Sequence, residues 1–430
     1  MAVDTSMELR NQVMYSVFVR NHTEEGTFQA LKQDLDRIRS LGVDIIWLLP
    51  IYPIGEQARK GSLGSPYAIR DYRNVNPELG TMDDFRELVS AIHARGMRCI
   101  IDIVYNHTSP DSVLAAAHPE WFYHRPDGSF YNRIGDWTDI IDLDYSRKDL
   151  WAYQIETLKQ WASLVDGFRC DVASLVPLPF WLEARKQVSE VRPDCLWLSE
   201  SVEPEFIVWN RSRGIGSLSD SELYQAFDIT YDYDIFGEFQ RYLNGQIPLE
   251  AYADRINQQE SIYPENYVKL RFLENHDRER IASFIRDPVS LDNWTAFLYF
   301  QKGTVLLYGG QEFACTHKPS LFEKDPFSRD SDAVLAPLLQ NLYRIRQNPL
   351  LRHSTYSVRV SPDDFLVAEH RSGSHRLIGV FSVKGHRGTV PVDLPSGVYG
   401  NQIGGKPVEV RNGTIYSEGA PVILETGNTD

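Results

Sequence analysis

The segment VDGFRCD (residues 165–171) is a short apolar run that ends in a carboxylate, and LWLSE (196–200) has the same form. Their acids, Asp171 and Glu200, lie 29 residues apart. This is about the length of one strand-plus-helix unit, so the two strands are expected to be neighbours in a parallel sheet. A third strand-end acid, Asp277, closes KLRFLENHD another 77 residues on. Because the carboxyl ends of parallel strands meet on one face of a barrel, the three acids are predicted to converge there.

Strand-like and helix-like runs alternate from residue 13 to about residue 350. FQALKQDLDRIRSLG (28–42) has apolar residues at helical spacing and ends in glycine, and TMDDFRELVSAIHARG (81–96) begins with a threonine N-cap. The intervening runs are continuously apolar, which is typical of parallel strands buried on both faces. About eight such strands favour a (β/α)8 TIM barrel, an α/β fold, over a doubly wound sheet. They are expected near residues 13–19, 43–50, 97–104, 165–171, 195–199, 226–230, 268–273 and 304–308.

Two segments depart from this alternation. Residues 107–145 follow the third strand, are rich in Gly, Asp, Pro and aromatic residues, and show no helical period. Long loops of this kind are usually functional. After about residue 352, short alternating strands with Gly, Pro and Asn turns follow, including the hairpin signal Asn412-Gly413. We therefore expect a barrel formed by 1–106 and 146–351, a short insertion at 107–145, and a C-terminal antiparallel β-sandwich at 352–430.

The composition restricts the function classes. The chain of 430 residues carries 59 acidic and 44 basic residues, a net charge of −15, which argues against nucleic acid and anionic membrane surfaces as partners. Its amino terminus, MAVDTSMELRNQV, lacks the regions of a secretory signal, and no apolar run approaches the ~18 residues of a membrane span. The four cysteines have no CxxC spacing and are expected to be free and reduced. A cytoplasmic protein without nucleic-acid or membrane partners is predicted.

The residues around the first acid predict its chemistry. Arg169 and Asp171 share one face of their strand, because side chains two residues apart point the same way. A fixed cation beside Asp171 is expected to lower its pKa and keep it ionised as a nucleophile. Glu200, placed among Asp171 and Asp277 in a partly dry cleft, is expected to have a raised pKa and to act as a general acid. Such a pair of carboxyl groups is suited to breaking a glycosidic bond by double displacement.

Further polar and aromatic residues are predicted to join the acids. Asp102 and Asn106 share a face of the third strand, with His107 beside them, and His276 directly precedes the third acid. The two histidines are expected to donate hydrogen bonds to sugar hydroxyls. Tyr67, in GSPYAIRDY after the second strand, is expected to stack on the reacting ring.

Taken together, these motifs resemble those of the α-amylase family of retaining glycoside hydrolases over essentially the whole chain. The matching segments are SPYAIRDY (65–72), DIVYNH (102–107), GFRCDVA (167–173), the Glu of LWLSES, FLENHD (272–277) and LLYGGQEF (306–313). The resemblance implies that Asp171 is the nucleophile, Glu200 the acid/base and Asp277 a stabiliser of the transition state. It also implies that Arg169, His107 and His276 hold the sugar, with Tyr67 stacking and Asp102 supporting Arg169. Residues 107–145 would correspond to the family's domain B, here short, and the tail to its C-terminal β-domain.

Departures from the family pattern concern metal binding and linkage. Many secreted relatives have Lys-His shortly after the nucleophile, where the His carbonyl helps to hold calcium, whereas this chain has Ser174-Leu175. Asn106 remains as a ligand, but half of the site is missing, so no obligatory calcium and no other cofactor are predicted. The nucleophile motif is more similar to that of the neopullulanase and cyclomaltodextrinase group, which leaves both α-1,4 and α-1,6 linkages open.

The predicted function is a retaining hydrolase that cleaves α-1,4 linkages of maltooligosaccharides or soluble α-glucans. Two alternatives would use the same residues. One is a 4-α-glucanotransferase, in which water is excluded from the acceptor site; the other is an α-1,6-acting oligosaccharide glucosidase. A non-enzymatic binding relative is disfavoured, because all three carboxylates are present.

Overall fold

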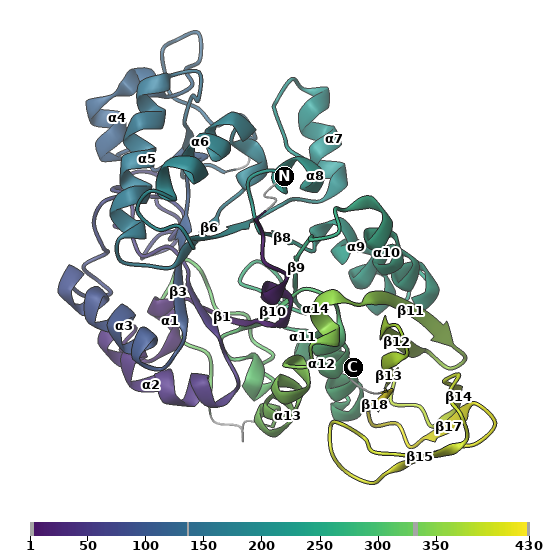
Figure 1. Ribbon diagram of the computed structural model, residues 1–430. Coiled ribbons are helices and arrows are strands. Elements are labelled where there is room, and N and C mark those ends of the chain that lie inside the picture. The colour runs from purple at the N-terminus through teal and green to yellow at the C-terminus, as the bar shows by residue number, and fades with distance from the viewer. Residues whose placement is uncertain (1–3, 136, 330–333, 428–430) are drawn as a thin grey trace.

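The computed structural model describes residues 4–135, 137–329 and 334–427, and its centre is a closed barrel of parallel strands (Figure 1). Strand β1 pairs with both β2 and β10, which closes the barrel. The barrel strands are β1 (Val13–Val17), β2 (Ile45–Leu48), β3 (Arg98–Ile103), β6 (Gly167–Cys170), β7 (Leu196–Ser199), β8 (Ile229–Tyr231), β9 (Lys269–Arg271) and β10 (Thr304–Tyr308). Each strand expected from the sequence is present, and the predicted TIM barrel is confirmed.

The strands form where the sequence is continuously apolar. Every residue of β1 and of β10 is buried, so both faces of these strands pack inside the protein. β6 and β7 are hydrogen-bonded in parallel, with Arg169 opposite Leu198. Asp171 and Glu200 each follow the last residue of their strand, so the two acids leave the barrel side by side, as their spacing predicts.

Helices surround the barrel (Figure 1). Outside the 107–145 segment they are η1 (Met7–Asn11), α1 (Val19–His22), α2 (Phe28–Ser40), α3 (Met82–Ala94), α5 (Lys148–Ala162), η3 (Ala173–Leu175), α6 (Leu178–Val188), α7 (Pro204–Ser212), α8 (Asp220–Leu223), α9 (Tyr233–Leu243), α10 (Leu249–Ile262), α11 (Ile281–Phe284), α12 (Pro288–Phe300), η4 (Gln311–Phe313), α13 (Ala336–Arg346) and α14 (Leu350–His353). The Thr27 and Thr81 hydroxyls cap α2 and α3, and Asp84 completes a capping box at α3. None of the helices in the described part of the chain has the length and apolar character needed to cross a membrane.

The segment 107–145 leaves the barrel between β3 and α5. It contains β4 (His107–Thr108), α4 (Val113–Ala117), η2 (Pro119–Trp121) and β5 (Ile141–Asp142). β4 and β5 pair antiparallel, so the segment returns to its starting point. The expectation of a stretch without helix was wrong at α4, where the Ser112 hydroxyl accepts the N–H of Ala115 and caps the first turn. The exact boundaries of the insertion and of the other two domains stay predictions.

The C-terminal strands, yellow-green to yellow in Figure 1, form an antiparallel sheet in the order β11-β12-β13-β18, accompanied by the pairs β14-β17 and β15-β16. Their bounds are β11 (Thr355–Ser361), β12 (Phe365–Ser372), β13 (His375–Ser382), β14 (Gly388–Pro391), β15 (Gly397–Tyr399), β16 (Val408–Val410), β17 (Thr414–Ser417) and β18 (Val422–Thr426). A core of Val, Ile, Leu and Phe side chains joins the sheet to the pairs, as in the predicted sandwich. Asn412 and Gly413 both have positive φ and turn the chain between β16 and β17.

This C-terminal domain packs on helices of the barrel. Asn257 of α10 exchanges hydrogen bonds of 2.7 and 2.8 Å with the backbone of Val358 in β11. Phe381 of β13 meets Phe297 of α12 edge-on, with ring centroids 5.5 Å apart. None of the domain's described residues lines the cavity at the strand-end acids. The domain therefore packs against the helices outside the barrel and not against the cavity.

Candidate active site

A cavity of about 330 Å³ opens where Asp171, Glu200 and Asp277 leave the barrel strands. All three acids line it, so their predicted convergence is observed. Asp171 and Glu200 are each 7% exposed, whereas the Asp277 side chain is 41% exposed. Of these three acids, two are therefore nearly dry and one faces solvent.

One guanidinium organises the buried acids. Arg169 Nη1 donates to Asp102 Oδ1 and to Asp171 Oδ1, both at 2.8 Å, and its Nη2 lies 2.9 Å from Glu200 Oε2. Arg169 and Asp102 are fully buried. Because a guanidinium is planar and its donors have fixed directions, these contacts hold Asp171 and Glu200 in a fixed relation to each other.

Burial dominates the protonation of these acids. It raises the pKa of Glu200 to about 8 despite the opposing effect of Arg169, and the charges of Asp171 and Asp277 add to the rise. The expected raised pKa of Glu200 is therefore confirmed. The expected lowering for Asp171 was wrong, because burial outweighs Arg169 and raises its pKa to about 7. Burial therefore favours the protonated form of both acids, and Arg169 favours the ionised form of both.

The backbone that follows Asp171 is strained. Val172 has φ 34° and ψ 45°, in the left-handed region that β-branched residues rarely adopt. Its N–H donates a 2.7 Å hydrogen bond to Glu200 Oε2. A backbone of this kind costs about 1–3 kcal/mol and persists where the surroundings enforce it. The hydrogen bond of this strained residue links the segment that follows β6 to the acid that follows β7.

Tyr67 and His276 form a stacked pair in the cavity wall. Their ring centroids are 5.5 Å apart at an interplanar angle of 11°. The Tyr67 hydroxyl lies 2.7 Å from His276 Nε2 and 3.1 Å from Asp102 Oδ2. Burial lowers the pKa of His276 to about 4 and also lowers the pKa of His107. Both imidazoles are therefore mainly neutral at pH 7, and a neutral imidazole offers one donor and one acceptor to a hydroxyl-rich ligand.

Asn106 faces an internal cation. Its Oδ1 accepts a 3.1 Å hydrogen bond from Arg133 Nη2, and Arg133 Nε donates to Asp142 Oδ2 at 2.8 Å. The guanidinium supplies the positive charge that the buried Asp142 carboxylate needs, so this donor set does not fit a calcium ion. Across the described residues, no three His, Cys, Asp or Glu side chains are gathered so that they could hold a metal.

The predicted site residues fall into two sets. Those that line the cavity are Tyr67, His107, Asp171, Glu200, His276 and Asp277. Arg169 was expected to hold the sugar, with Asp102 and Asn106 near it in the substrate site, but all three are at most 1% exposed and do not line the cavity. Their contacts with Asp171, Tyr67 and Arg133 make them positioning residues, because burial keeps their side chains from the ligand space.

Sequence reasoning missed three aromatic residues of the cavity, Trp137, Tyr233 and Phe322. Trp137 lies with its ring 5.8 Å from that of His107, and Tyr233 accepts a hydrogen bond from Asn275 at 3.0 Å. The aromatic content of 107–145 was the signal for Trp137, but it does not single out one ring. Tyr233 stands two residues past the end of β8, a position at which strand-end residues enter the site of a barrel.

A parallel barrel that places three acids, a buried arginine and neutral histidines at its strand ends defines a class of glycoside-cleaving barrel enzymes. Residues 12–117 and 113–341 match the family described as alpha amylase, catalytic domain. Residues 357–424 match the bacterial alpha amylase C-terminal domain. The chain belongs to the alpha-amylase family of glycoside hydrolases, as its motifs predict.

Solved structures of this family are similar over the whole chain. An alpha-amylase from Lactobacillus plantarum is 50% identical, with a TM-score of 0.96, and the match covers 98% of this chain and 100% of that one. A noncanonic maltogenic alpha-amylase, AmyB from Thermotoga neapolitana, is 33% identical, with a TM-score of 0.86 and coverage of 97% and 99%.

Curated relatives are longer proteins. Alpha-amylase MalA of Haloarcula japonica is 29% identical over 416 residues, which cover 91% of this chain and 58% of the relative. An alpha-1,4-glucan:maltose-1-phosphate maltosyltransferase of Myxococcus xanthus is 32% identical over 259 residues, which cover 54% of this chain and 38% of the relative. This chain therefore spans less than two thirds of the length of each.

Proposed function

We propose that this protein hydrolyses α-1,4 linkages in maltooligosaccharides or soluble α-glucans with retention of anomeric configuration. The observation that carries the proposal is the contact of one buried guanidinium with both Asp171 and Glu200. It keeps the two carboxyl groups close, as double displacement requires. Similarity to proteins named alpha-amylases supports the same reaction.

In this mechanism Asp171 is the nucleophile and Glu200 the acid/base. The Asp171 carboxylate attacks the anomeric carbon while the bond to the leaving oxygen breaks and Glu200 gives that oxygen its proton. The ionised Glu200 then takes a proton from water, whose oxygen attacks the same carbon and releases Asp171. The raised pKa of Glu200 suits its role as the proton donor in the first step. Asp277 faces the cavity and is proposed to stabilise positive charge in the transition state.

A second cavity supports an oligosaccharide as the substrate. It measures about 600 Å³, and its lining includes Tyr123, Tyr131 and Arg213. Ser174 in the second cavity stands two residues after Val172 in the first, so the two cavities share one segment of chain. No carboxylate occurs among its described lining residues. Aromatic faces and hydrogen-bond donors suit a neutral, hydroxyl-rich chain that extends beyond the reacting sugar.

The second candidate function is transfer of a glucan to a sugar acceptor. It is favoured by the similarity to a protein named a maltosyltransferase. A transferase would use the same two steps, with an acceptor hydroxyl in place of water in the second.

We further propose that the enzyme needs no calcium and works in the cytoplasm. The pairing of Arg133 with Asp142 supports the first proposal. Cys99, Cys170 and Cys195 are buried and free, and Cys315 is free and partly buried, which supports a reducing compartment.

The test is a time course of products from maltoheptaose, with Asp171→Asn as the control. Products that are only shorter than the substrate, with the α-anomer formed first by NMR, are expected. Early products longer than seven sugars would instead establish transfer. Unchanged activity of Asp171→Asn would refute the proposed nucleophile.

A further inference from the structure

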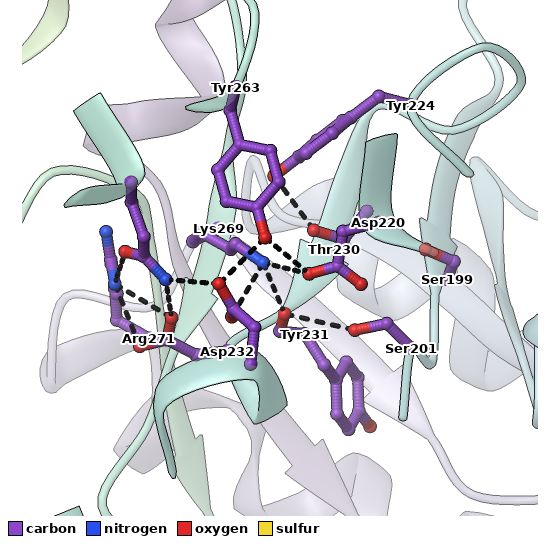
Figure 2. Close-up of polar contacts among 12 residues, drawn as sticks. Ser199, Ser201, Asp220, Tyr224, Thr230, Tyr231, Asp232, Tyr263, Lys269 and Arg271 are labelled. Atoms are coloured by element: carbon purple, nitrogen blue, oxygen red, sulfur yellow. Dashed lines mark hydrogen bonds and ion pairs between the residues drawn. The ribbon is translucent and has the colours of Figure 1, made fainter. Parts of the chain in front are cut away.

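A group of buried charged side chains gathers around Lys269, where β8 and β9 run next to each other (Figure 2). Lys269 of β9 is fully buried and contacts two carboxylates, Asp220 at the start of α8 and Asp234 in α9, the second at 2.9 Å. The Tyr263 hydroxyl donates to both carboxylates, at 3.1 and 2.8 Å. None of these four residues lines the cavity with the three acids.

Lys269 carries its charge inside the protein. Burial opposes that charge, but Asp220 and Asp234 outweigh burial and hold the pKa of Lys269 well above its usual range. Its third contact is a backbone group, because Nζ donates to the carbonyl oxygen of Tyr231 at 3.1 Å. An ammonium group with three donors can direct all of them at fixed partners, and here each one has a partner.

One set of contacts leads from this group toward Glu200. Ser201 directly follows Glu200 and is fully buried. Its hydroxyl lies 3.2 Å from the Tyr231 carbonyl oxygen, which Lys269 also contacts (Figure 2). The segment that follows Glu200 is thereby linked to one of the three partners of Lys269, the Tyr231 carbonyl oxygen.

A second set leads toward Asp171. The Tyr231 side chain crosses to the centre of the barrel, where its hydroxyl accepts a 3.2 Å hydrogen bond from Arg169 Nε. Arg169 Nη1 donates to Asp102 and Asp171, and its Nη2 forms an ion pair with Glu200. Tyr231 is therefore held at its carbonyl by Lys269 and in turn holds the guanidinium that orders the acids.

We propose that Lys269 is a positioning residue for both catalytic carboxyl groups, acting through Ser201 on Glu200 and through Tyr231 and Arg169 on Asp171. The inference rests on the proposed function for the roles of the two acids. Lys269 acts through geometry, since Asp220 and Asp234 offset its charge locally. The charged groups that shift the pKa of Glu200 are Arg169, Asp171 and Asp277. Small misplacements of reacting groups reduce rates by about 100-fold per ångström.

The chain offers a matched control. Lys302 is also buried, at 6% exposure, and pairs with one carboxylate, Glu260, at 2.8 Å, but no described hydrogen bond of its ammonium group leads to Tyr231 or Ser201. Lys269→Met and Lys302→Met each remove a buried ammonium group from a carboxylate. Both are expected to lower the melting temperature. The two substitutions should differ in catalysis.

The experiment compares kcat, KM and pH–rate profiles of these variants on maltoheptaose with those of the wild type. Lys269→Met should lower kcat by about 10- to 100-fold with KM within about twofold, whereas Lys302→Met should leave both within about twofold. If kcat and the pH profile of Lys269→Met match those of Lys302→Met, the inference is refuted.

Single-contact variants test each set separately and also serve if Lys269→Met fails to fold. Tyr231→Phe frees Arg169, which holds down the pKa of Asp171, so the acid limb of the profile should move to higher pH. Ser201→Ala loosens the segment of Glu200 and should move the basic limb to lower pH, because exposure relieves the effect of burial. Limbs that stay in place in both variants would overturn the inference.

Two controls separate this inference from the proposed function. Lack of wild-type activity on any glucan, or full activity of Asp171→Asn, would refute the function itself. The pH dependence of the melting temperature of Tyr231→Phe needs no substrate and still reports the pKa of the acids. It should differ from that of the wild type between pH 5 and 9, and an unchanged dependence refutes the Tyr231 arm.

Discussion

Glu200→Gln should abolish activity and at the same time stabilise the protein at alkaline pH. Burial raises the pKa of Glu200 from its ordinary 4.5 to about 8. The folded state thus binds this proton more tightly than the unfolded state does. A raised pKa contributes stability that is fully present below about pH 4.5 and is lost as the pH rises through about 8. Glutamine keeps the shape of the neutral acid and has no proton to lose.

The size of the effect follows from the two pKa values. The difference between about 8 and 4.5, at about 1.36 kcal/mol for each pKa unit, is about 5 kcal/mol as an upper bound. Unfolding of a chain of 430 residues has an entropy of about 0.9 kcal/mol/K, at about 2.1 cal/mol/K per residue. Above pH 8.5 the melting temperature of Glu200→Gln should therefore exceed that of the wild type by up to about 5 °C.

The assay is differential scanning calorimetry from pH 5 to pH 9. The gap between Glu200→Gln and wild type should be small at pH 5, should widen as the pH rises to about 8, and should stay constant above it. Glu418→Gln changes a glutamate whose side chain is 71% exposed and serves as the control, with no gap at any pH. A gap of equal size at pH 5 and pH 9, or a variant that is less stable than wild type at pH 9, would show that burial does not set the protonation of Glu200.

Two further results are expected. Tyr131→Ala and Arg213→Ala change residues of the second cavity, and each should lower kcat/KM for maltoheptaose by about 5- to 10-fold, equivalent to about 1 kcal/mol. Neither should change kcat/KM for maltotriose. Equal losses on both substrates would exclude a role of these residues in binding longer chains. A chelator should not change the melting temperature, whereas Arg133→Met should lower it by several degrees, because removing one partner of a buried ion pair costs about 3–5 kcal/mol. A chelator that destabilises the wild type would contradict the assignment of Arg133 as the internal cation.

Local order could be predicted from the sequence for a direct physical reason. Continuous apolar runs such as Ile45–Leu48 can be satisfied only where both faces of a strand are buried, and that requirement is met by a helix-covered parallel sheet. The start of the helix predicted at 81–96 could be recognised from Thr81 and Asp84, which form a capping box through hydrogen bonds within one turn. Such contacts join residues that are close in the sequence, so a local sequence pattern is enough to predict them.

Parts of the site were also predictable, because parallel topology brings strand ends together. Asp171, Glu200 and Asp277 reach one cavity as soon as their strands belong to one barrel. The position of Asn106 was not predictable. Its partner Arg133 lies in an irregular segment whose path back to the barrel depends on the pairing of β4 with β5.

The sequence by itself determined the barrel, its strand-end acids and the membership of a family, since these follow from periodicity, spacing and motif. Only the tertiary structure decided how the acids are protonated, because burial is a property of the assembled cavity, and it reversed the expected direction for Asp171. It also decided that Lys269, 98 residues away in sequence from Asp171, is linked to Arg169 through Tyr231. The positions of such side chains depend on contacts between segments that are distant in the sequence, and a local sequence pattern does not predict these contacts.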